Sequence, residues 1–249
     1  MDQATTQGVK MLAVSVNMMG RPSVLNLTLI CDGENVILVD TGLPGQLASI
    51  REAMQQQAGV DFEKINQVIL THHDIDHIGG LRELLNELPG RVRVLSHVVE
   101  RDYIDGTKRP LKLVKMEENF DSLPEATKAF YPVMKKAFEG TPAPVDEVLK
   151  GGDELPYCGG ITVIFTPGHT LGHISLYVKE SKTLIAGDAL RVDENGMLDI
   201  AAASSNHDMD LCKQSMQTLT NYDIATVICY HGGLYQGDAN QRIATLASA

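Results

Sequence analysis

The run from His72 to His77 is the densest group of potential metal ligands in the chain, with histidine or aspartate at every position except Ile75. Imidazole nitrogens and carboxylate oxygens suit zinc, and also iron or manganese. An apolar segment precedes the run and an amphipathic one follows it, so rigid elements are expected to hold it on both sides. We therefore predict a metal site here. The alternative is a chance polar loop with a capped helix.

Three more potential ligands each stand just beyond a predicted strand. His169 lies in the turn Thr-Pro-Gly-His-Thr, Asp188 follows a glycine, and His231 follows a tyrosine. A single histidine at a strand end is more often a surface or capping residue. Four strand ends that carry histidine or aspartate in one chain are expected to converge on one rim of the fold.

Short apolar runs separated by turn residues predict the strands that position these groups. A hairpin is predicted over 24–39, with its turn at 32–35. The other predicted strands are 68–70, 92–95, 161–166, 174–178, 184–186 and 227–229.

Apolar residues at helical spacing predict helices over 45–57, 81–88, 209–220 and 239–246, and Asp208 is placed to cap the third. Strands precede helices in both halves of the chain. We therefore predict an α+β fold in which two sheets pack together with helices on the outside.

Residues 97–150 differ from the rest, because they are charged and mostly helical in pattern, with Phe130, Val133, Met134 and Phe138 on one face. We interpret them as an insertion or cap on a single domain spanning 1–249, rather than as a second domain. Three roles stay open: shaping the substrate site, mediating a homodimer, or forming an ordinary surface segment.

The composition narrows the possible partners. The chain has 249 residues and a formal net charge of −11, which argues against nucleic acid and anionic membrane. Its four cysteines are scattered without a Cys-x-x-Cys pair, which favours a reducing, cytoplasmic location. The N-terminus shows no signal-peptide pattern, and no apolar run approaches the ~20 residues of a membrane helix. A small-molecule substrate is the expected partner.

The motifs and their order resemble the metallo-β-lactamase superfamily over residues 24–233. The resemblance rests on Asp40-Thr41-Gly42, on 72–77 followed by Ile78-Gly79-Gly80, on Pro-Gly-His-Thr at 167–170, on Gly187-Asp188 and on Tyr230-His231-Gly232. It implies an αββα sandwich of two mixed β-sheets, with two divalent metal ions at one edge and hydrolase activity.

The superfamily pattern His-x-His-x-Asp-His implies a ligand for each position. One site would take His72, Asp74 and His169, the other would take Asp76, His77 and His231, and Asp188 would bridge them. His73 falls on an x position and is expected to point away, unless the loop shifts register by one.

Asp74 stands where this pattern has a histidine. A carboxylate adds a negative charge and a harder ligand, which should lower the Lewis acidity of the first metal and favour iron or manganese. Zinc is our first expectation, and iron or manganese our second. Asp74 also motivates an alternative function, a non-hydrolytic diiron redox or dioxygenase protein. A catalytically inactive binding module is a third possibility.

The resemblance implies hydrolysis by a hydroxide that bridges two metals roughly 3.5–4 Å apart and attacks a carbonyl. We predict that Asp76 orients this nucleophile and carries a proton to the leaving group. Asp40 is predicted to hold a ligand histidine in its tautomer, or else to cap a turn. His173 is predicted to support the site, or else to serve packing.

A small ester or lactone is the predicted substrate, because the length and compactness of the chain resemble those of acyl-homoserine lactonases. Those enzymes have a tyrosine where this chain has Arg191. Arg191 would pair with a substrate carboxylate or phosphate, and His207 would lie at the mouth of the site; the alternatives are a surface arginine and a capping residue. A thioesterase or β-lactam hydrolase on the same fold is the alternative function.

Overall fold

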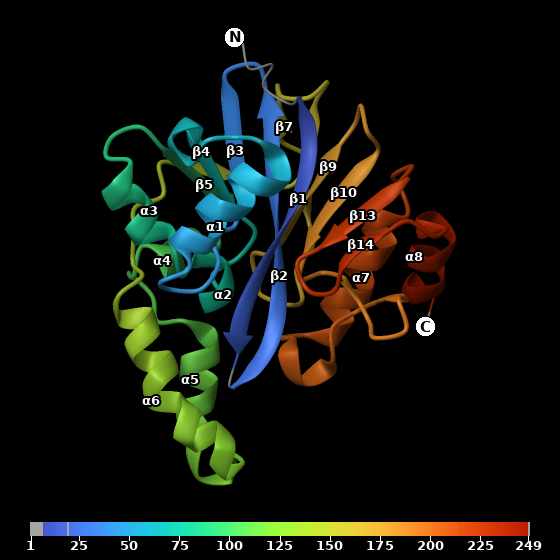
Figure 1. Ribbon diagram of the computed structural model, residues 1–249. Coiled ribbons are helices and arrows are strands. Elements are labelled where there is room, and N and C mark those ends of the chain that lie inside the picture. Colours follow the sequence, from blue (N-terminus) through green and yellow to red (C-terminus); the bar gives the residue numbers. More distant parts are fainter. Residues whose placement is uncertain (1–6, 19, 249) are drawn as a thin grey trace.

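Two six-stranded sheets stack face to face, with helices on both outer faces (Figure 1). This computed structural model describes residues 7–18 and 20–248. Our expectation about a signal peptide falls mainly on residues 1–6, which lie outside the described residues.

The first sheet has the strand order β1-β2-β3-β4-β5-β6. Its strands are Gly8–Met18 (β1), Arg21–Asp32 (β2), Asn35–Val39 (β3), Gln67–Leu70 (β4), Arg93–His97 (β5) and Glu147–Leu149 (β6). The strands β1 to β3 pair antiparallel through hairpins, whereas β3 to β6 pair parallel. Parallel neighbours need crossover connections, which is where helices enter this half of the chain.

The second sheet has the order β14-β13-β10-β9-β8-β7 and is also mixed, because only β10 and β13 pair parallel. Its strands are Glu154–Leu155 (β7), Ile161–Phe165 (β8), Ile174–Val178 (β9), Thr183–Gly187 (β10), Thr226–Cys229 (β13) and Gly233–Tyr235 (β14). A small separate hairpin joins Arg191–Val192 (β11) to Leu198–Asp199 (β12). Each large sheet is therefore built from one continuous half of the chain.

Most of the helices cover the two outer faces. Those of the first half are Leu47–Ala53 (α1), Ile75–Ile78 (α2), Leu81–Glu87 (α3), Arg101–Ile104 (α4), Leu111–Glu118 (α5) and Glu125–Glu139 (α6). Those of the second half are Met209–Leu219 (α7) and Ala239–Ala247 (α8). A π-helical turn at Met54–Ala58 extends α1, and short 3-10 turns occupy Phe62–Lys64, Phe120–Ser122 and Ala203–Ser205.

The central strands are apolar on both faces, because each sheet is covered on both sides there. In β3, Ile37 and Val39 pack between the two sheets, while Val36 and Leu38 pack under the first layer of helices. Such strands read as continuous apolar runs rather than as alternating ones. The predicted sandwich of two mixed sheets with outer helices is confirmed.

Most predicted elements are confirmed within a few residues, and β1 is the main omission. Leu12, Val14 and Val16 are buried and alternate with exposed neighbours, which is the local signal of a half-buried strand. The predicted cap of α7 is confirmed, since the Asp208 carboxylate accepts the N–H groups of Asp210 and Leu211 at 2.9 and 3.0 Å.

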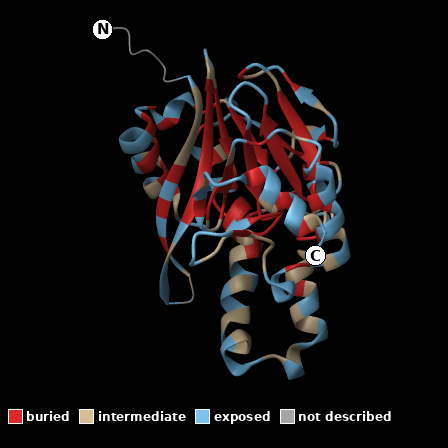
Figure 2. Ribbon diagram, turned by 90° about the vertical axis from the view of Figure 1, so that its right-hand side faces the viewer, coloured by how far each residue is buried: buried red, intermediate tan, exposed pale blue. Residues whose placement is uncertain are grey.

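Within 97–150, helices α5 and α6 form an arm that projects away from the sandwich (Figures 1 and 2). Phe138 is buried at its base, whereas Val133, which was predicted to share a helix face with it, is 59% exposed. The half-buried stripe of α6 instead runs through Phe130, Tyr131 and Met134. Among the described residues, no helix is both long and apolar enough to span a membrane.

Candidate metal centre

The seven predicted ligands meet at one edge of the sandwich. The loop after β4 and the start of α2 carry His72, Asp74, Asp76 and His77 from the first sheet, and the ends of β8, β10 and β13 bring His169, Asp188 and His231 from the second. A strand end is a suitable place for such groups, because the loop backbone is anchored by the sheet behind it. Residues up to 159 positions apart therefore share one site.

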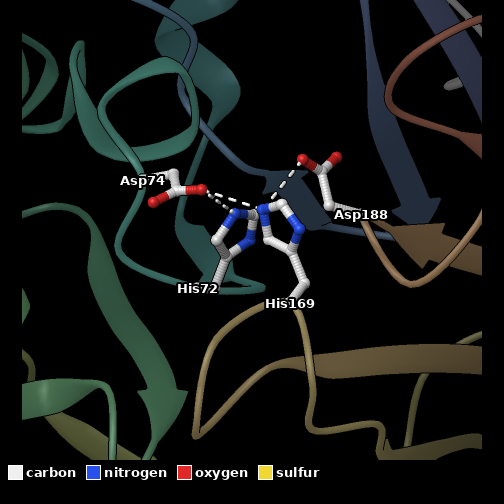
Figure 3. A group of neighbouring side chains, drawn as sticks. All are labelled: His72, Asp74, His169 and Asp188. Atoms are coloured by element: carbon white, nitrogen blue, oxygen red, sulfur yellow. Dashed lines mark hydrogen bonds and ion pairs between the residues drawn. The ribbon is translucent and has the colours of Figure 1, made fainter. Parts of the chain in front are cut away.

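The side chains separate into two groups whose ligand atoms lie within 4.8 Å of one another. His72, Asp74, His169 and Asp188 form the first group, shown in Figure 3, and Asp76, His77 and His231 form the second. These are the two sets implied by the resemblance, and both are suited to a dinuclear metal centre.

Asp188 lies between the two groups. One of its carboxylate oxygens is 3.3 Å from His169 Nε2 and 3.4 Å from His231 Nε2, and the other is 3.4 Å from His77 Nε2. A carboxylate that faces ligands of both groups is placed to bridge two ions. The first group therefore includes Asp188 as well as the three residues assigned to it from the sequence.

Three histidines are held by their outer ring nitrogens. His77 Nδ1 lies 2.8 Å from Asp40 Oδ2, His169 Nδ1 lies 2.9 Å from Asn206 Oδ1, and His72 Nδ1 lies 3.0 Å from the Thr71 hydroxyl. An acceptor at Nδ1 fixes the proton there and leaves Nε2 with its lone pair exposed, which is the form that binds a metal. Each Nε2 faces the centre.

Buried atoms without partners show that divalent ions fit this arrangement. Among the described residues, Nε2 of His72 and of His77, Oδ1 of Asp74 and Oδ1 of Asp188 are buried and make no hydrogen bond. Leaving buried polar atoms unsatisfied is costly. Metal ions coordinated by the two histidine nitrogens and by Asp188 would remove that cost, while Asp74 faces the other ligands of its group with Oδ2. The donor set of imidazole and carboxylate suits zinc, iron or manganese.

Asp40 occupies a strained position behind His77. Its φ of 63° is left-handed, which is uncommon for a residue other than glycine. The Thr71 N–H donates to Asp40 Oδ1 at 2.8 Å, and the Thr71 hydroxyl donates to Oδ2 at 2.9 Å. These contacts aim the carboxylate at His77, as the predicted tautomer-holding role requires.

His173 lies beneath the centre rather than in it. Its Nδ1 is 2.9 Å from the Thr166 hydroxyl, and its Nε2 accepts the backbone N–H of Asp188 at 3.0 Å. Gly187 makes this contact possible, because a Cβ at that position would lie 2.7 Å from His173 Nε2. His173 therefore holds the backbone that presents Asp188.

His73 joins neither group. Its backbone N–H donates to Glu100 Oε2 at 2.9 Å, its Nδ1 contacts the same oxygen, and its ring stacks on Tyr103. Glu100 Oε1 accepts the hydroxyl of Thr170 at 2.8 Å and the N–H of Gly172 at 2.7 Å. The buried Glu100 carboxylate thus ties the 72–77 loop to the loop that carries His169.

The electrostatics of the cluster favour positive charge. Burial lowers the pKa of His231, but the Asp188 and Asp76 carboxylates outweigh burial and raise it to about 10. The pKa of His77 is raised well above its usual value, because Asp188, Asp40 and Asp76 overcome its burial. Burial raises the pKa of Asp76, but the His77 and His231 charges bring it down to about 2. Without metal ions, protons on His77 and His231 can therefore balance the carboxylate charges that bound cations would otherwise balance.

The two predicted substrate-binding residues lie apart from the ligands. Arg191 opens the β11 strand with an exposed side chain, near Asp193. His207 is exposed, and its backbone N–H donates to Gly168 O at 2.9 Å in the loop that carries His169. Their contact with substrate stays a prediction. His231 is 34% exposed at its side chain, which makes the second group the more open one.

Sequence reasoning missed Thr71, Glu100, Lys112 and Asn206. Thr71, Glu100 and Asn206 orient ligands or ligand loops, and Lys112 contacts Asp74. Thr71 had a local signal, because it directly precedes the ligand run. The other three lie at least 27 residues from the ligands or loops they contact, and no short-range pattern marks them.

Solved structures of known proteins place this fold in one class. A metallo-beta-lactamase family protein from Thermus thermophilus matches with a TM-score of 0.72 and 24% identity, over 97% of this chain and 78% of that one. An archaeal metallo-beta-lactamase superfamily protein from Sulfolobus tokodaii matches with a TM-score of 0.65 and 21% identity, over 97% and 85%. The fold is the metallo-β-lactamase fold.

The family follows from the sequence. The profile of the Metallo-beta-lactamase superfamily matches residues 20–231, and the chain therefore belongs to the metallo-β-lactamase superfamily. The predicted resemblance to this superfamily is confirmed, whereas the similarity to lactonases stays a prediction.

Curated relatives cover parts of the chain. "Probable metallo-hydrolase YflN" of Bacillus subtilis is 29% identical over 168 residues, which is 66% of this chain and 59% of the relative. A hydroxyacylglutathione hydrolase of a Synechococcus strain is 32% identical over 121 residues, which is 48% of this chain and 32% of that relative. A beta-lactamase-like protein 2 homolog of Caenorhabditis elegans is 26% identical over 165 residues, which is 66% of this chain and 44% of that relative. The matches span less than two thirds of these relatives.

Proposed function

We propose that this protein is a dinuclear metal-dependent hydrolase that cleaves a small ester or lactone. The observation that carries the proposal is the ligand geometry: Nε2 of His72 and of His77 and one oxygen each of Asp74 and Asp188 are buried without hydrogen bonds, and each histidine is fixed from behind at Nδ1. Membership of the superfamily and the relative described as a metallo-hydrolase support it.

The chemistry that two bound divalent ions supply is polarisation of a carbonyl and acidification of a water molecule. The protein holds the ligand atoms in place before the reaction begins, so little reorganisation is needed. His72, Asp74 and His169 with Asp188 would hold one ion, and Asp76, His77 and His231 with Asp188 the other.

Asp76 is the proposed proton carrier. Its carboxylate is 3.2 Å from His231 Nε2 and retains 12% exposure, so it lies on the open side of the centre. An ionised carboxylate in this position can accept the proton of the nucleophile. Protonated Asp76 could then deliver that proton to the leaving alkoxide.

A thioester is the second candidate substrate, because hydroxyacylglutathione hydrolases are among the relatives. The substrate is to be tested on purified protein with zinc, iron or manganese restored, against lactones, esters, thioesters, β-lactams and phosphodiesters. We expect turnover of a lactone or simple ester, with two metals per chain by elemental analysis. Turnover of phosphodiesters alone, or of a dioxygenase substrate alone, would contradict the proposal.

The ligand assignment has its own test. His72→Ala removes a ligand of the first group and is expected to lower the metal content to about one ion per chain and turnover by at least 100-fold. His97→Ala is a matched control, because His97 ends β5 and belongs to neither group. Unchanged metal content in His72→Ala would rule out the assignment.

A further inference from the structure

The projecting arm of α5 and α6 reaches the metal centre through one side chain. The Lys112 ammonium of α5 contacts Asp74 Oδ2. The same oxygen lies 2.9 Å from His169 Nε2 and 3.2 Å from His72 Nε2, so it is the oxygen that faces the first group of ligands. A lysine from the arm and the ligands of a metal ion therefore share one carboxylate.

Asp74 needs a counter-charge more than a surface carboxylate does. Its side chain is only 2% exposed, and Asp76 and Asp188 add two more carboxylates to the same cluster. A buried charge without a partner is strongly unfavourable. Among the described residues, Lys112 is the only lysine or arginine that forms an ion pair with any of the seven ligand candidates.

We propose that Lys112 is a positioning residue that acts as the fixed counter-charge of Asp74 and thereby sets the metal affinity and electrophilicity of the first group. The inference rests on the proposed two-metal function and deepens it. Asp74 differs from the imidazole ligands His72 and His169 in bringing one negative charge. Lys112 cancels that charge, so the centre carries the same total charge as one with a neutral ligand at position 74.

Two opposite effects follow from this charge balance. The ammonium repels a metal cation and draws electron density from the carboxylate, so it weakens metal binding. For the same reasons it keeps the bound metal more electrophilic than an unpaired carboxylate would. Removing the charge of Lys112 should therefore tighten metal binding while slowing turnover.

A purely structural role predicts a different outcome. The Lys112 side chain is 41% exposed and could serve only to fasten the arm to the sandwich. Losing a fastening contact would loosen the ligand geometry, and metal binding and turnover would both weaken. The direction of the change in metal affinity therefore separates the two roles.

The test uses the full chain with Lys112→Met, which keeps the length of the side chain and removes its charge. We would measure the dissociation constant for Zn²⁺ by competition with a chelator, for the first and second equivalents. Lys112→Met is expected to bind zinc at least about tenfold more tightly, because a unit charge beside a weakly screened ion is lost. Turnover of the best substrate of the panel should fall by about tenfold. Lys115→Met on the exposed side of the same helix is the matched control and should match the wild type.

A charge-exchange pair sharpens the test. Asp74→His alone leaves Lys112 unpaired beside the ions and is expected to weaken zinc binding, by about tenfold or more. Combining it with Lys112→Met restores the original total charge and should return the affinity to within a few-fold of the wild type. Lys112→Arg, which retains the charge, should also stay near the wild type.

Three results would overturn the inference: weaker zinc binding in Lys112→Met, an affinity equal to that of the Lys115→Met control, or no recovery in the double variant. Wild-type protein that binds no divalent ion would instead overturn the proposed function itself. The zinc measurement needs no substrate, so the two failures can be told apart.

Discussion

Glu100 shows how one buried side chain can hold two ligand loops. It is fully buried and accepts hydrogen bonds from the backbone of His73 and Gly172 and from the Thr170 hydroxyl. Of these three donor residues, His73 lies between the ligands His72 and Asp74, and Thr170 and Gly172 follow the ligand His169. A carboxylate is suited to this place because it accepts at both oxygens and donates at neither.

Glu100→Gln should therefore weaken metal binding. One end of the carboxamide becomes an NH₂ donor facing other donors, so at least one backbone N–H loses its partner. We expect metal affinity to fall by about 10-fold and the protein to lose about 1–3 kcal/mol of stability. Chelator competition and urea unfolding measure these effects, with exposed Glu118→Gln as the control. An unchanged metal affinity in Glu100→Gln would show that the two ligand loops keep their geometry without the hydrogen bonds to Glu100.

At the scale of elements, the ligand run depends on a close approach of two backbones. A Cβ on Gly80 would lie 2.3 Å from the carbonyl oxygen of Thr41, and the Thr41 N–H donates to His77 O at 2.7 Å. The turn after β3 and the end of α2 are therefore pressed together directly beside the ligand His77. Only glycine leaves room for this contact.

Gly80→Ala is accordingly expected to destabilise the protein by about 1–3 kcal/mol or more, because the clash involves backbone and cannot be relieved by a rotamer change. Gly140→Ala is the matched control. Both glycines have ordinary negative φ values, of −85° and −89°, but the nearest atom to a Cβ on Gly140 lies at 3.7 Å. Urea denaturation of the metal-loaded proteins compares them, and equal loss in both variants would contradict this account.

The sequence predicted the secondary-structure elements and the ligands better than the residues that hold the ligands in place. Strands such as β4 and β10 are short buried apolar runs bounded by turns, and these patterns are local. The ligands stand at the ends of such strands, so locating the strands located His169, Asp188 and His231 as well. Asn206, Glu100 and Lys112 meet their partners only in the folded chain, and their identities alone carry no signal of that contact.

At the scale of the whole molecule, metal-free protein should become less stable as the pH rises. His231 has a folded pKa of about 10, above its ordinary value near 6.5, and the pKa of His77 is also raised. A raised histidine pKa contributes stability that is complete below about pH 6.5 and is lost as the pH rises towards the folded value. The pKa values of His72 and His173 are lowered, so these two histidines change the stability only below about pH 6.5.

Urea unfolding of chelator-treated protein at pH 7, 8.5 and 10 measures this dependence. Between pH 7 and 8.5 we expect a loss of about 1 kcal/mol or more. His231→Gln should reduce the loss in that interval without abolishing it, because His77 also contributes. Buried thiols such as Cys212 contribute only at higher pH. Zinc-saturated protein should not show the loss, because ions rather than protons then balance the carboxylates. A metal-free protein that gains stability from pH 7 to 8.5 would contradict the prediction.

The division of the two sheets between the two halves of the chain has a consequence for assembly. The first sheet ends at Leu149, the second begins at Glu154, and the connection passes through the exposed pair Gly151-Gly152. Each proposed metal ion takes ligands from both sides of this point. Two separately produced fragments, cut between the glycines, would each carry an incomplete coordination shell. The two fragments would then associate through shared metal ions. Their binding to each other would strengthen when zinc is added, and a chelator would separate them again.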